Sequence, residues 1–251
     1  MTASFRERLE DSSKSHKSRL VLALDLNIEE GLSESALDLV EQIGCELAAV
    51  KINYHLLLPL ALTDLRRVVD AAHRKGLQTI ADLKLNDISS TNLTVVKLLY
   101  EAGFDAFIAN PIVGYRDALQ PTIEEAHTRG MGVIFLTYMS HKGASEGYGL
   151  KITLRSGLVK PLYKLFAERA LKWGADGIIV GATRPSIIKE VAALTKNTLP
   201  IFSPGVGVQG GSALEALNAG ADYLIVGRSI IDSSDRIAEA RRLREWSWVA
   251  R

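Results

Sequence analysis

The sequence contains one cysteine, no long apolar run and almost no excess of either charge. Cys45 has no partner for an intramolecular disulfide, which favours a reducing, intracellular environment. No apolar stretch approaches the roughly 18 residues that a membrane helix requires, and residues 1–19 are polar and charged, without the apolar core of an export signal. We therefore expect a soluble, cytoplasmic protein that is neither exported nor membrane-bound.

Several classes of function lack their usual sequence signals. The 30 Lys and Arg residues are balanced by 29 Asp and Glu residues and do not form the basic stripe of a nucleic-acid-binding surface. The five histidines show no metal-ligand spacing, and there is no H-E-x-x-H motif or cysteine cluster. No G-x-S-x-G motif surrounds Ser140 and His141. These absences argue against nucleic-acid binding, a zinc site and a hydrolase triad.

What the sequence does contain is an alternation of two kinds of segment. Short runs rich in Val, Ile and Leu predict buried parallel strands. The predicted strands are 20–25, 47–52, 79–84, 106–111, 133–139, 177–182, 200–206 and 223–228. Between them, helical periodicity predicts helices over 33–43, 65–74, 91–102, 117–128, 158–173, 185–194 and 211–219.

Eight strands alternating with helices in a chain of this length predict a single-domain (β/α)₈ TIM barrel. We place the barrel at residues 20–251, after a polar N-terminal segment of residues 1–19. A doubly wound sheet is the competing fold. One stretch interrupts the alternation, because residues 140–157 are longer than the usual βα loop of about 2 to 6 residues. Such a loop is either a lid or binding loop, or an ordinary surface insertion.

Charged residues stand where several predicted strands end, which is where barrel active sites form. The densest group is Asp82 and Lys84, whose two-residue spacing places both side chains on one face of a strand. Inside a barrel neither could stay charged without a partner, and Asp25 and Lys51 on the two preceding strands are natural partners. Asp87 follows shortly afterwards, just before the next helix. The pattern predicts an array of alternating Asp and Lys side chains at the catalytic end of the barrel.

A glycine-rich stretch follows the seventh predicted strand. It carries the spacing G-x-G-x-x-G in Gly205, Gly207 and Gly210, but it stands too late in the chain for the first turn of a dinucleotide fold. Loops after the seventh and eighth strands of a barrel commonly bind phosphate through backbone N–H groups. Arg228, at the end of the eighth strand, supplies a matching cation. These residues predict a phosphorylated small-molecule ligand.

Together these motifs resemble the orotidine 5′-phosphate decarboxylase family, in order from about residue 20 to residue 230. The resemblance is carried by the following residues: Asp82-x-Lys84-x-x-Asp87-Ile88-x-x-Thr91, Leu22-Ala23-Leu24-Asp25, Val50-Lys51, Met139-Ser140-His141, Pro204-Gly205-Val206-Gly207-x-Gln209-Gly210-Gly211 and Val226-Gly227-Arg228. It implies decarboxylation of orotidine 5′-phosphate to uridine 5′-phosphate, the last step of de novo UMP biosynthesis, without metal or other cofactor. It also implies a homodimer with shared active sites.

The same resemblance assigns roles to individual residues. Lys84 would protonate C6 of the pyrimidine, beside a charge network formed by Asp25, Lys51, Asp82 and Asp87. The substrate-binding residues that it implies are Asp25 and Lys51 at the ribose, Thr91 with Asp87 at the neighbouring subunit's substrate, Ser140 at the pyrimidine, Gln209 between base and phosphate, the Gly227 backbone and Arg228 at the phosphate, and Pro204, Gly205, Gly207 and Gly210 in the glycine-rich loop.

Two other functions remain open. A related set of barrels, such as the hexulose-phosphate synthases, uses a similar D-x-K-x-x-D strand for Mg²⁺-dependent chemistry on sugar phosphates. Those enzymes place an acidic residue at the end of the second strand, whereas this chain has Lys51. A non-catalytic phosphate-binding barrel is the other alternative, although such a protein has no need for a strained array of charges.

Overall fold

A computed structural model describes residues 3–249 and shows eight parallel strands closed into a barrel. In their order around the barrel, the strands are β1 (Leu20–Ala23), β2 (Ala49–Asn53), β3 (Gln78–Leu85), β4 (Ala106–Ala109), β5 (Gly132–Tyr138), β8 (Gly177–Val180), β9 (Ile201–Pro204) and β10 (Tyr223–Val226). Each overlaps one predicted strand, and β10 pairs with β1 to complete the ring. The predicted (β/α)₈ fold is confirmed and the doubly wound sheet is excluded.

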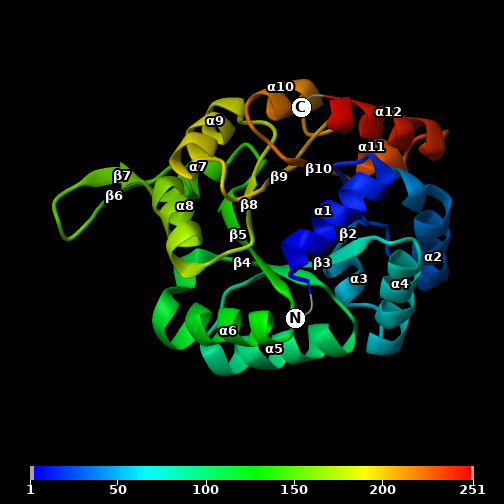
Figure 1. Ribbon diagram of the computed structural model, residues 1–251, viewed down its shortest axis with the longest axis horizontal. Helices are drawn as coiled ribbons and strands as arrows, with labels where there is room; N and C mark the ends of the chain where they lie inside the picture. The colour runs from blue at the N-terminus through cyan, green and yellow to red at the C-terminus, as the bar shows by residue number, and fades with distance from the viewer. Residues whose placement is uncertain (1–2, 250–251) are drawn as a thin grey trace.

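Helices surround the barrel, as Figure 1 shows. The longer ones are α2 (Leu32–Ile43), α4 (Leu62–Arg74), α5 (Ser89–Glu101), α6 (Gln120–Thr128), α8 (Leu162–Trp173), α9 (Pro185–Leu194), α10 (Ala213–Asn218) and α12 (Arg236–Val249). Short helical turns also occur at α3 (Tyr54–Leu57), α7 (Ala144–Gly147), α11 (Arg228–Ile231), η1 (Gly44–Glu46), η2 (Pro111–Val113) and η3 (Tyr115–Leu119).

Three helices begin later than the periodicity predicts: α10 begins two residues late, at Ala213, and the other two begin beside a proline. The helix expected from residue 117 starts at Gln120, with Pro121 in its first turn. The helix expected from residue 158 starts at Leu162, directly after Pro161. Proline fits the start of a helix but not its interior, because it has no N–H group and its ring clashes with the preceding turn.

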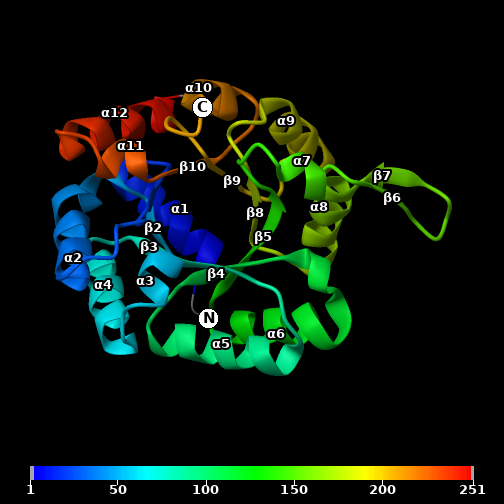
Figure 2. The same cartoon turned by 180° about the vertical axis from the view of Figure 1, so that it is seen from behind.

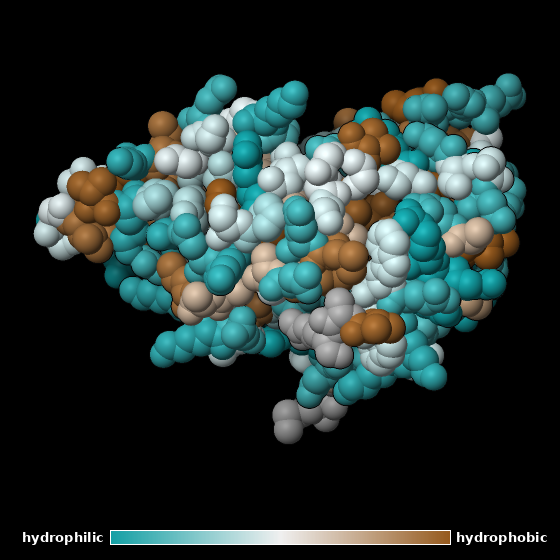
Figure 3. Space-filling model, turned by 90° about the horizontal axis from the view of Figure 1, so that it is seen from above, coloured by the Kyte–Doolittle hydropathy of each residue, from teal (hydrophilic) through white to brown (hydrophobic). Residues whose placement is uncertain are grey.

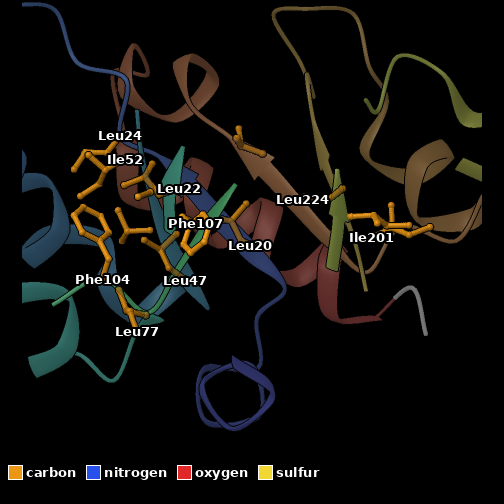
Figure 4. Close-up of a cluster of buried hydrophobic side chains, with 14 of the residues drawn as sticks. Leu20, Leu22, Leu24, Leu47, Ile52, Leu77, Phe104, Phe107, Ile201 and Leu224 are labelled. Atoms are coloured by element: carbon orange, nitrogen blue, oxygen red, sulfur yellow. The ribbon is translucent and has the colours of Figure 1, made fainter. Parts of the chain in front are cut away.

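The strands present alternate residues to two separate cores. Leu20, Leu22 and Leu24 face outward and pack with the helices in the larger core, part of which Figure 4 shows. Val21 and Ala23 face inward to a smaller core within the barrel. Successive strand residues point to opposite faces, so the next inward position on this strand is the one after Leu24. This alternation determines which side chains reach the mouth of the barrel.

The polar N-terminal segment forms a helix, α1 (Phe5–His16), which the sequence analysis did not predict. Figure 1 shows α1, in blue, lying across the ring of strands. Phe5 and Leu9 are almost fully buried and belong to the inner core of the barrel. Gly132 makes room for this contact, because a Cβ atom there would overlap the Phe5 ring. α1 therefore packs against the amino-terminal end of the barrel. The predicted boundary at residue 20 stays a prediction.

The long loop after β5 contains α7 and a two-stranded hairpin, β6 (Lys151–Thr153) and β7 (Val159–Pro161). Figures 1 and 2 show the hairpin projecting outward beyond the ring of helices. Apolar side chains gather at this projecting end, on the left of Figure 3, and Leu158 and Val159 are exposed. The hairpin thus extends away from the barrel rather than across its mouth.

Candidate active site

Three inward-facing residues at the carboxyl ends of adjacent strands form an ion-paired group. The Lys51 Nζ atom lies 2.8 Å from Asp82 Oδ2 and 3.4 Å from Asp25 Oδ1. Lys51 and Asp82 are buried, with 5% and 7% of their surfaces exposed, whereas Asp25 is partly exposed. The predicted partnership between the first three strands is therefore present in the structure.

The partners keep these buried groups charged. Burial alone would lower the pKa of the Lys51 ammonium, but the carboxylates of Asp82 and Asp25 outweigh burial and raise this pKa. Burial opposes ionisation of Asp82 as well, yet Lys51 and Lys84 lower its pKa below the ordinary value. Removing Lys51 would leave Asp82 and Asp25 without the buried cation that they share, which is strongly destabilising, whereas removing the partly exposed Lys84 leaves Asp82 paired with Lys51.

Lys84 joins the group through an irregularity in β3. Its ammonium lies 2.7 Å from Asp82 Oδ1, and its side chain is about one-third exposed, at 34%. The pairing between β3 and β4 shifts between Ala81 and Leu85, and Lys84 adopts a φ of +49°. This left-handed conformation costs a non-glycine residue on the order of 1–3 kcal/mol, and such residues cluster at active sites. Asp82 thus holds a partly exposed cation on a strained backbone.

These charged groups line a cavity of about 520 Å³ at the carboxyl end of the barrel. Its floor consists of apolar inward-facing residues, including Ile108, Leu136 and Ile225. The predicted site residues that line the cavity are Asp25, Lys51, Asp82, Lys84, Ser140, Pro204, Gly205, Gln209, Gly227 and Arg228. The fold therefore brings residues from six strands to one cavity of a size that suits a small molecule.

The loop after β9 contacts the loop after β5, and both loops line the cavity. The Ser140 hydroxyl donates a hydrogen bond of 2.6 Å to Gln209 Oε1. Gly205 adopts a φ of +94°, and a Cβ atom there would lie 2.6 Å from Ser140 Cβ. Only glycine allows this close approach. Two of the predicted binding side chains, Ser140 and Gln209, thus already contact each other.

Gly207 and Gly210 shape the loop rather than line the cavity. The Gly207 amide donates to the Gly211 carbonyl, and the Gly210 amide donates to the Gly207 carbonyl. In this conformation these two N–H groups are therefore not free to bind a phosphate, contrary to the expectation for a glycine-rich cradle. Both residues have positive φ angles, which explains why glycine occupies the two positions.

The best-placed cation for a phosphate is Arg228, which follows β10 and lies beside the glycine-rich loop, since a Cβ atom on Gly207 would overlap the Ser229 hydroxyl oxygen. It is exposed at the first position of α11, and no carboxylate within residues 3–249 pairs with it. Gly227 lies close to β1, since a Cβ atom there would lie 3.1 Å from the Ala23 carbonyl oxygen. A free guanidinium above a cavity can bind phosphate oxygens through two parallel hydrogen bonds.

Asp87 and Thr91 lie outside this cavity. Both are exposed, and the Asp87 carboxylate accepts a hydrogen bond of 2.7 Å from the Ile88 amide. Ile88 is the N-cap residue of α5 and makes no side-chain cap. Within one chain, the structure therefore separates these two predicted site residues from the other charged groups.

Several residues that line the cavity were not predicted from the sequence. Asn27, Asn53, His55, Ser229 and Asp232 all line the cavity. Asn53 follows Lys51 by two residues, so strand alternation could have identified it. The others lie in loops or in short helices, where no periodicity indicates the direction of a side chain.

No group of three or more His, Cys, Asp or Glu residues is arranged as a metal site in the part of the chain that the structure describes. No helix within residues 3–249 has the length and apolar character needed to cross a membrane.

Two histidines pair with aspartates at the amino-terminal end of the barrel, away from the cavity. His73 lies 2.8 Å from Asp105, and His127 lies 2.9 Å from Asp176.

Comparison with known proteins gives consistent matches over most of the chain. Residues 18–243 match the family described as "Orotidine 5′-phosphate decarboxylase / HUMPS family". The orotidine 5′-phosphate decarboxylase of Pyrococcus abyssi is 37% identical over 89% of this chain and 96% of its own length.

Two solved structures have the same barrel. An orotidine 5′-monophosphate decarboxylase from Methanocaldococcus jannaschii, complexed with the inhibitor BMP, superimposes with a TM-score of 0.78 and 30% identity, over 90% of this chain and 97% of that one. The UMP synthase of Leishmania donovani superimposes with a TM-score of 0.84 and 30% identity. That match covers 97% of this chain and 56% of that longer one.

Proposed function

Since the chain belongs to the orotidine 5′-phosphate decarboxylase / HUMPS family, we propose that it is a carboxy-lyase that converts orotidine 5′-phosphate to uridine 5′-phosphate in pyrimidine biosynthesis. The observation that carries this proposal is the placement of Lys84. Its ammonium, 2.7 Å from Asp82, faces a cavity that is also lined by Arg228, which pairs with no carboxylate of residues 3–249. One cation is thus available for the reacting carbon and another for the phosphate.

The chemistry requires positive charge beside the carbon that loses CO₂. Breaking the bond between C6 and the carboxylate leaves an electron pair on C6, with little resonance stabilisation from the ring. A fixed ammonium stabilises this developing charge more than it stabilises the substrate, which lowers the barrier. Lys84 then transfers its proton to C6, which completes uridine 5′-phosphate and leaves a neutral amine that regains a proton from solvent.

Asp82 has two roles in this scheme. It holds the Lys84 ammonium in place, and it stands against the substrate carboxylate. Like charges repel in the bound substrate, and the repulsion falls as CO₂ departs. Lys51 keeps Asp82 ionised while this happens, since it is buried between Asp82 and Asp25 and donates to both. Asp25 and Lys51 also bind the ribose hydroxyls.

Binding energy from the phosphate, remote from C6, contributes to the rate. Arg228 and the Gly227 amide bind the phosphate, Gln209 connects base and phosphate, and Ser140 contacts the pyrimidine. The hydrogen bond between Ser140 and Gln209 supports this arrangement, because it links the loops after β5 and β9, which both line the cavity. Closure of these loops on the substrate would exclude water and position C6 against Lys84.

We also propose a homodimer in which each subunit completes the other's site. Asp87 and Thr91 are exposed and stand outside their own cavity, which suits residues that reach the 2′-hydroxyl region of a substrate in the neighbouring subunit. Mixing a Lys84→Ala variant with an Asp87→Ala variant then restores part of the activity, since hybrid dimers regain one intact site. No recovery after confirmed subunit exchange would exclude the shared site.

The family description also includes the HUMPS branch, and Lys51 argues against Mg²⁺-dependent sugar-phosphate chemistry here. The position where such an enzyme requires an acid holds a buried ammonium with a raised pKa, caused by Asp82 and Asp25 acting against burial. A cation at this point repels Mg²⁺. Independence from cofactors and a cytoplasmic location stay predictions.

The deciding experiment follows the ultraviolet absorbance of orotidine 5′-phosphate with purified protein in EDTA, beside a Lys84→Ala control. Turnover in EDTA that disappears in the variant supports the proposal and the role of Lys84. Without turnover, the assay is repeated with Mg²⁺ and a hexulose phosphate. Activity there identifies a sugar-phosphate enzyme, and ligand binding without turnover identifies a non-catalytic barrel.

A further inference from the structure

Tyr54 contacts the backbone between the two charged residues of β3. The Tyr54 hydroxyl, at the start of α3, donates a hydrogen bond of 2.7 Å to the carbonyl oxygen of Leu83. Leu83 lies between Asp82 and Lys84, and its side chain packs against the outer core. Tyr54 itself does not line the cavity. Any effect of this residue on Lys84 therefore passes through the backbone.

This contact lies where the regular backbone pairing of β3 with its neighbouring strands ends. The pairing between β2 and β3 ends at Asn53 and Asp82, and the pairing between β3 and β4 is irregular from Ala81 to Leu85. Lys84, at a φ of +49°, falls within this interval. The Tyr54 hydroxyl connects strands β2 and β3 one residue beyond their last backbone pair, Asn53 and Asp82. It thus holds the segment whose conformation points Lys84 towards Asp82.

Resting on the proposed function, we propose that Tyr54 is a positioning residue for Lys84. The bond to Leu83 keeps the left-handed backbone at Lys84 from relaxing to an extended conformation, which would move the ammonium away from Asp82. A proton donor must lie within hydrogen-bond distance of the atom that it protonates. Loss of this bond therefore slows the chemical step while leaving the substrate's phosphate and ribose contacts in place.

Tyr54→Phe tests this role, because it removes the hydroxyl and retains the ring. The matched control is Tyr100→Phe on α5. Tyr54 and Tyr100 are equally exposed, at 46% each, but the Tyr100 hydroxyl makes no hydrogen bond within residues 3–249. We expect kcat of Tyr54→Phe to fall by about 10-fold, with KM and Tm unchanged. The control should match the wild type in all three.

A second measurement does not depend on turnover. Both variants and the wild type are treated briefly with an amine-acylating reagent, and labelling of each lysine is quantified by mass spectrometry. Release of Lys84 from Asp82 should raise its labelling rate several-fold in Tyr54→Phe, relative to Lys142 as an internal reference. Buried Lys51 should stay protected in all three proteins.

The outcomes separate the two proposals. A wild type without decarboxylase activity, combined with faster Lys84 labelling in Tyr54→Phe, would refute the proposed function and support the positioning of Lys84. An active wild type whose kcat and Lys84 labelling are both unaffected by Tyr54→Phe would overturn the role of Tyr54. A raised KM with unchanged kcat would overturn it too, since that result indicates a binding contact.

Discussion

Aspartates lie at both ends of this barrel, but the groups that they bind differ between the two ends. At the mouth, defined by Asp25, Lys51, Asp82 and Lys84, carboxylates pair with ammonium groups. At the foot, the amino-terminal end of the barrel, aspartates accept hydrogen bonds of 2.8 Å from the amide at the start of a neighbouring strand. These foot pairs are Asp105 with Thr79, Asp176 with Val133, and Asp222 with Ile201.

The difference separates stability from activity. A carboxylate that accepts a bond from a backbone amide satisfies a donor that would otherwise lack a partner, and such charge-assisted bonds stabilise the fold. Buried ion pairs contribute little net stability because desolvation offsets their attraction. The strained φ of Lys84 adds a further cost at the mouth. We therefore expect substitution of the partly exposed Lys84 at the mouth to affect mainly activity, and substitutions at the foot to affect mainly stability.

The largest expected effect is the loss of decarboxylase activity caused by Lys84→Gly at the mouth. Decarboxylation should fall by about 10²- to 10⁴-fold, as expected for loss of a proton donor. Stability should rise by about 1 kcal/mol, because glycine adopts a positive φ without steric cost. Lys196→Gly is the matched control, because Lys196 has a φ of +52° and lies outside the cavity. It should gain similar stability at full activity, measured by urea unfolding and kcat.

The largest expected loss of stability comes from Phe5→Ala at the foot. Truncating this buried ring removes part of the inner core and should destabilise the protein by about 3–5 kcal/mol. Initial rates at 25 °C should stay within about twofold of the wild type, because the mouth lies at the other end of the barrel. Lys14→Ala, on the exposed face of the same helix, should change neither value. A large loss of kcat in folded Phe5→Ala protein would contradict the assignment of activity to the mouth and of stability to the foot.

A smaller effect is expected from Asp176→Ala. It leaves the Val133 amide without its acceptor and should destabilise the protein by about 1–3 kcal/mol, measured by urea unfolding. Asp176→Asn retains an oxygen that can accept from this amide, so it should lose less stability. Equal losses in the two variants would show that the charge of Asp176, rather than its bond to the strand, matters at the foot.

The smallest effect is a pH dependence from His127. Its hydrogen bond to Asp176, acting against partial burial, raises the pKa of the imidazole above its ordinary value of 6.5. A raised folded-state pKa means that protonation favours the folded state. The contribution is complete below the unfolded pKa and is lost as the pH rises through the folded pKa. His127→Gln should remove this dependence, which should amount to less than about 1 kcal/mol because the pair is partly exposed. Thermal unfolding between pH 5 and 9 measures it; an unchanged slope would exclude His127 as its source.

Much of the mouth could be predicted from sequence because strand alternation is local. Asp25, Lys51 and Asp82 follow inward-facing apolar residues at two-residue intervals, so their common face is independent of the rest of the fold. The burial of α1 could not be predicted in this way. Its buried residues Phe5 and Leu9 are separated by charged residues, and their burial depends on the opening of a barrel built from distant segments.

By itself, the sequence determined the eight strands, the charged residues at several strand ends and the glycines that permit positive φ angles, because hydrophobic period and residue type act over a few positions. Only the tertiary structure decided that Ser140 meets Gln209, which is 69 residues away, that Tyr54 supports Leu83, and that Asp87 stays outside its own cavity. These contacts depend on closure of the ring and on the irregularity of β3, which arise from pairing between distant strands.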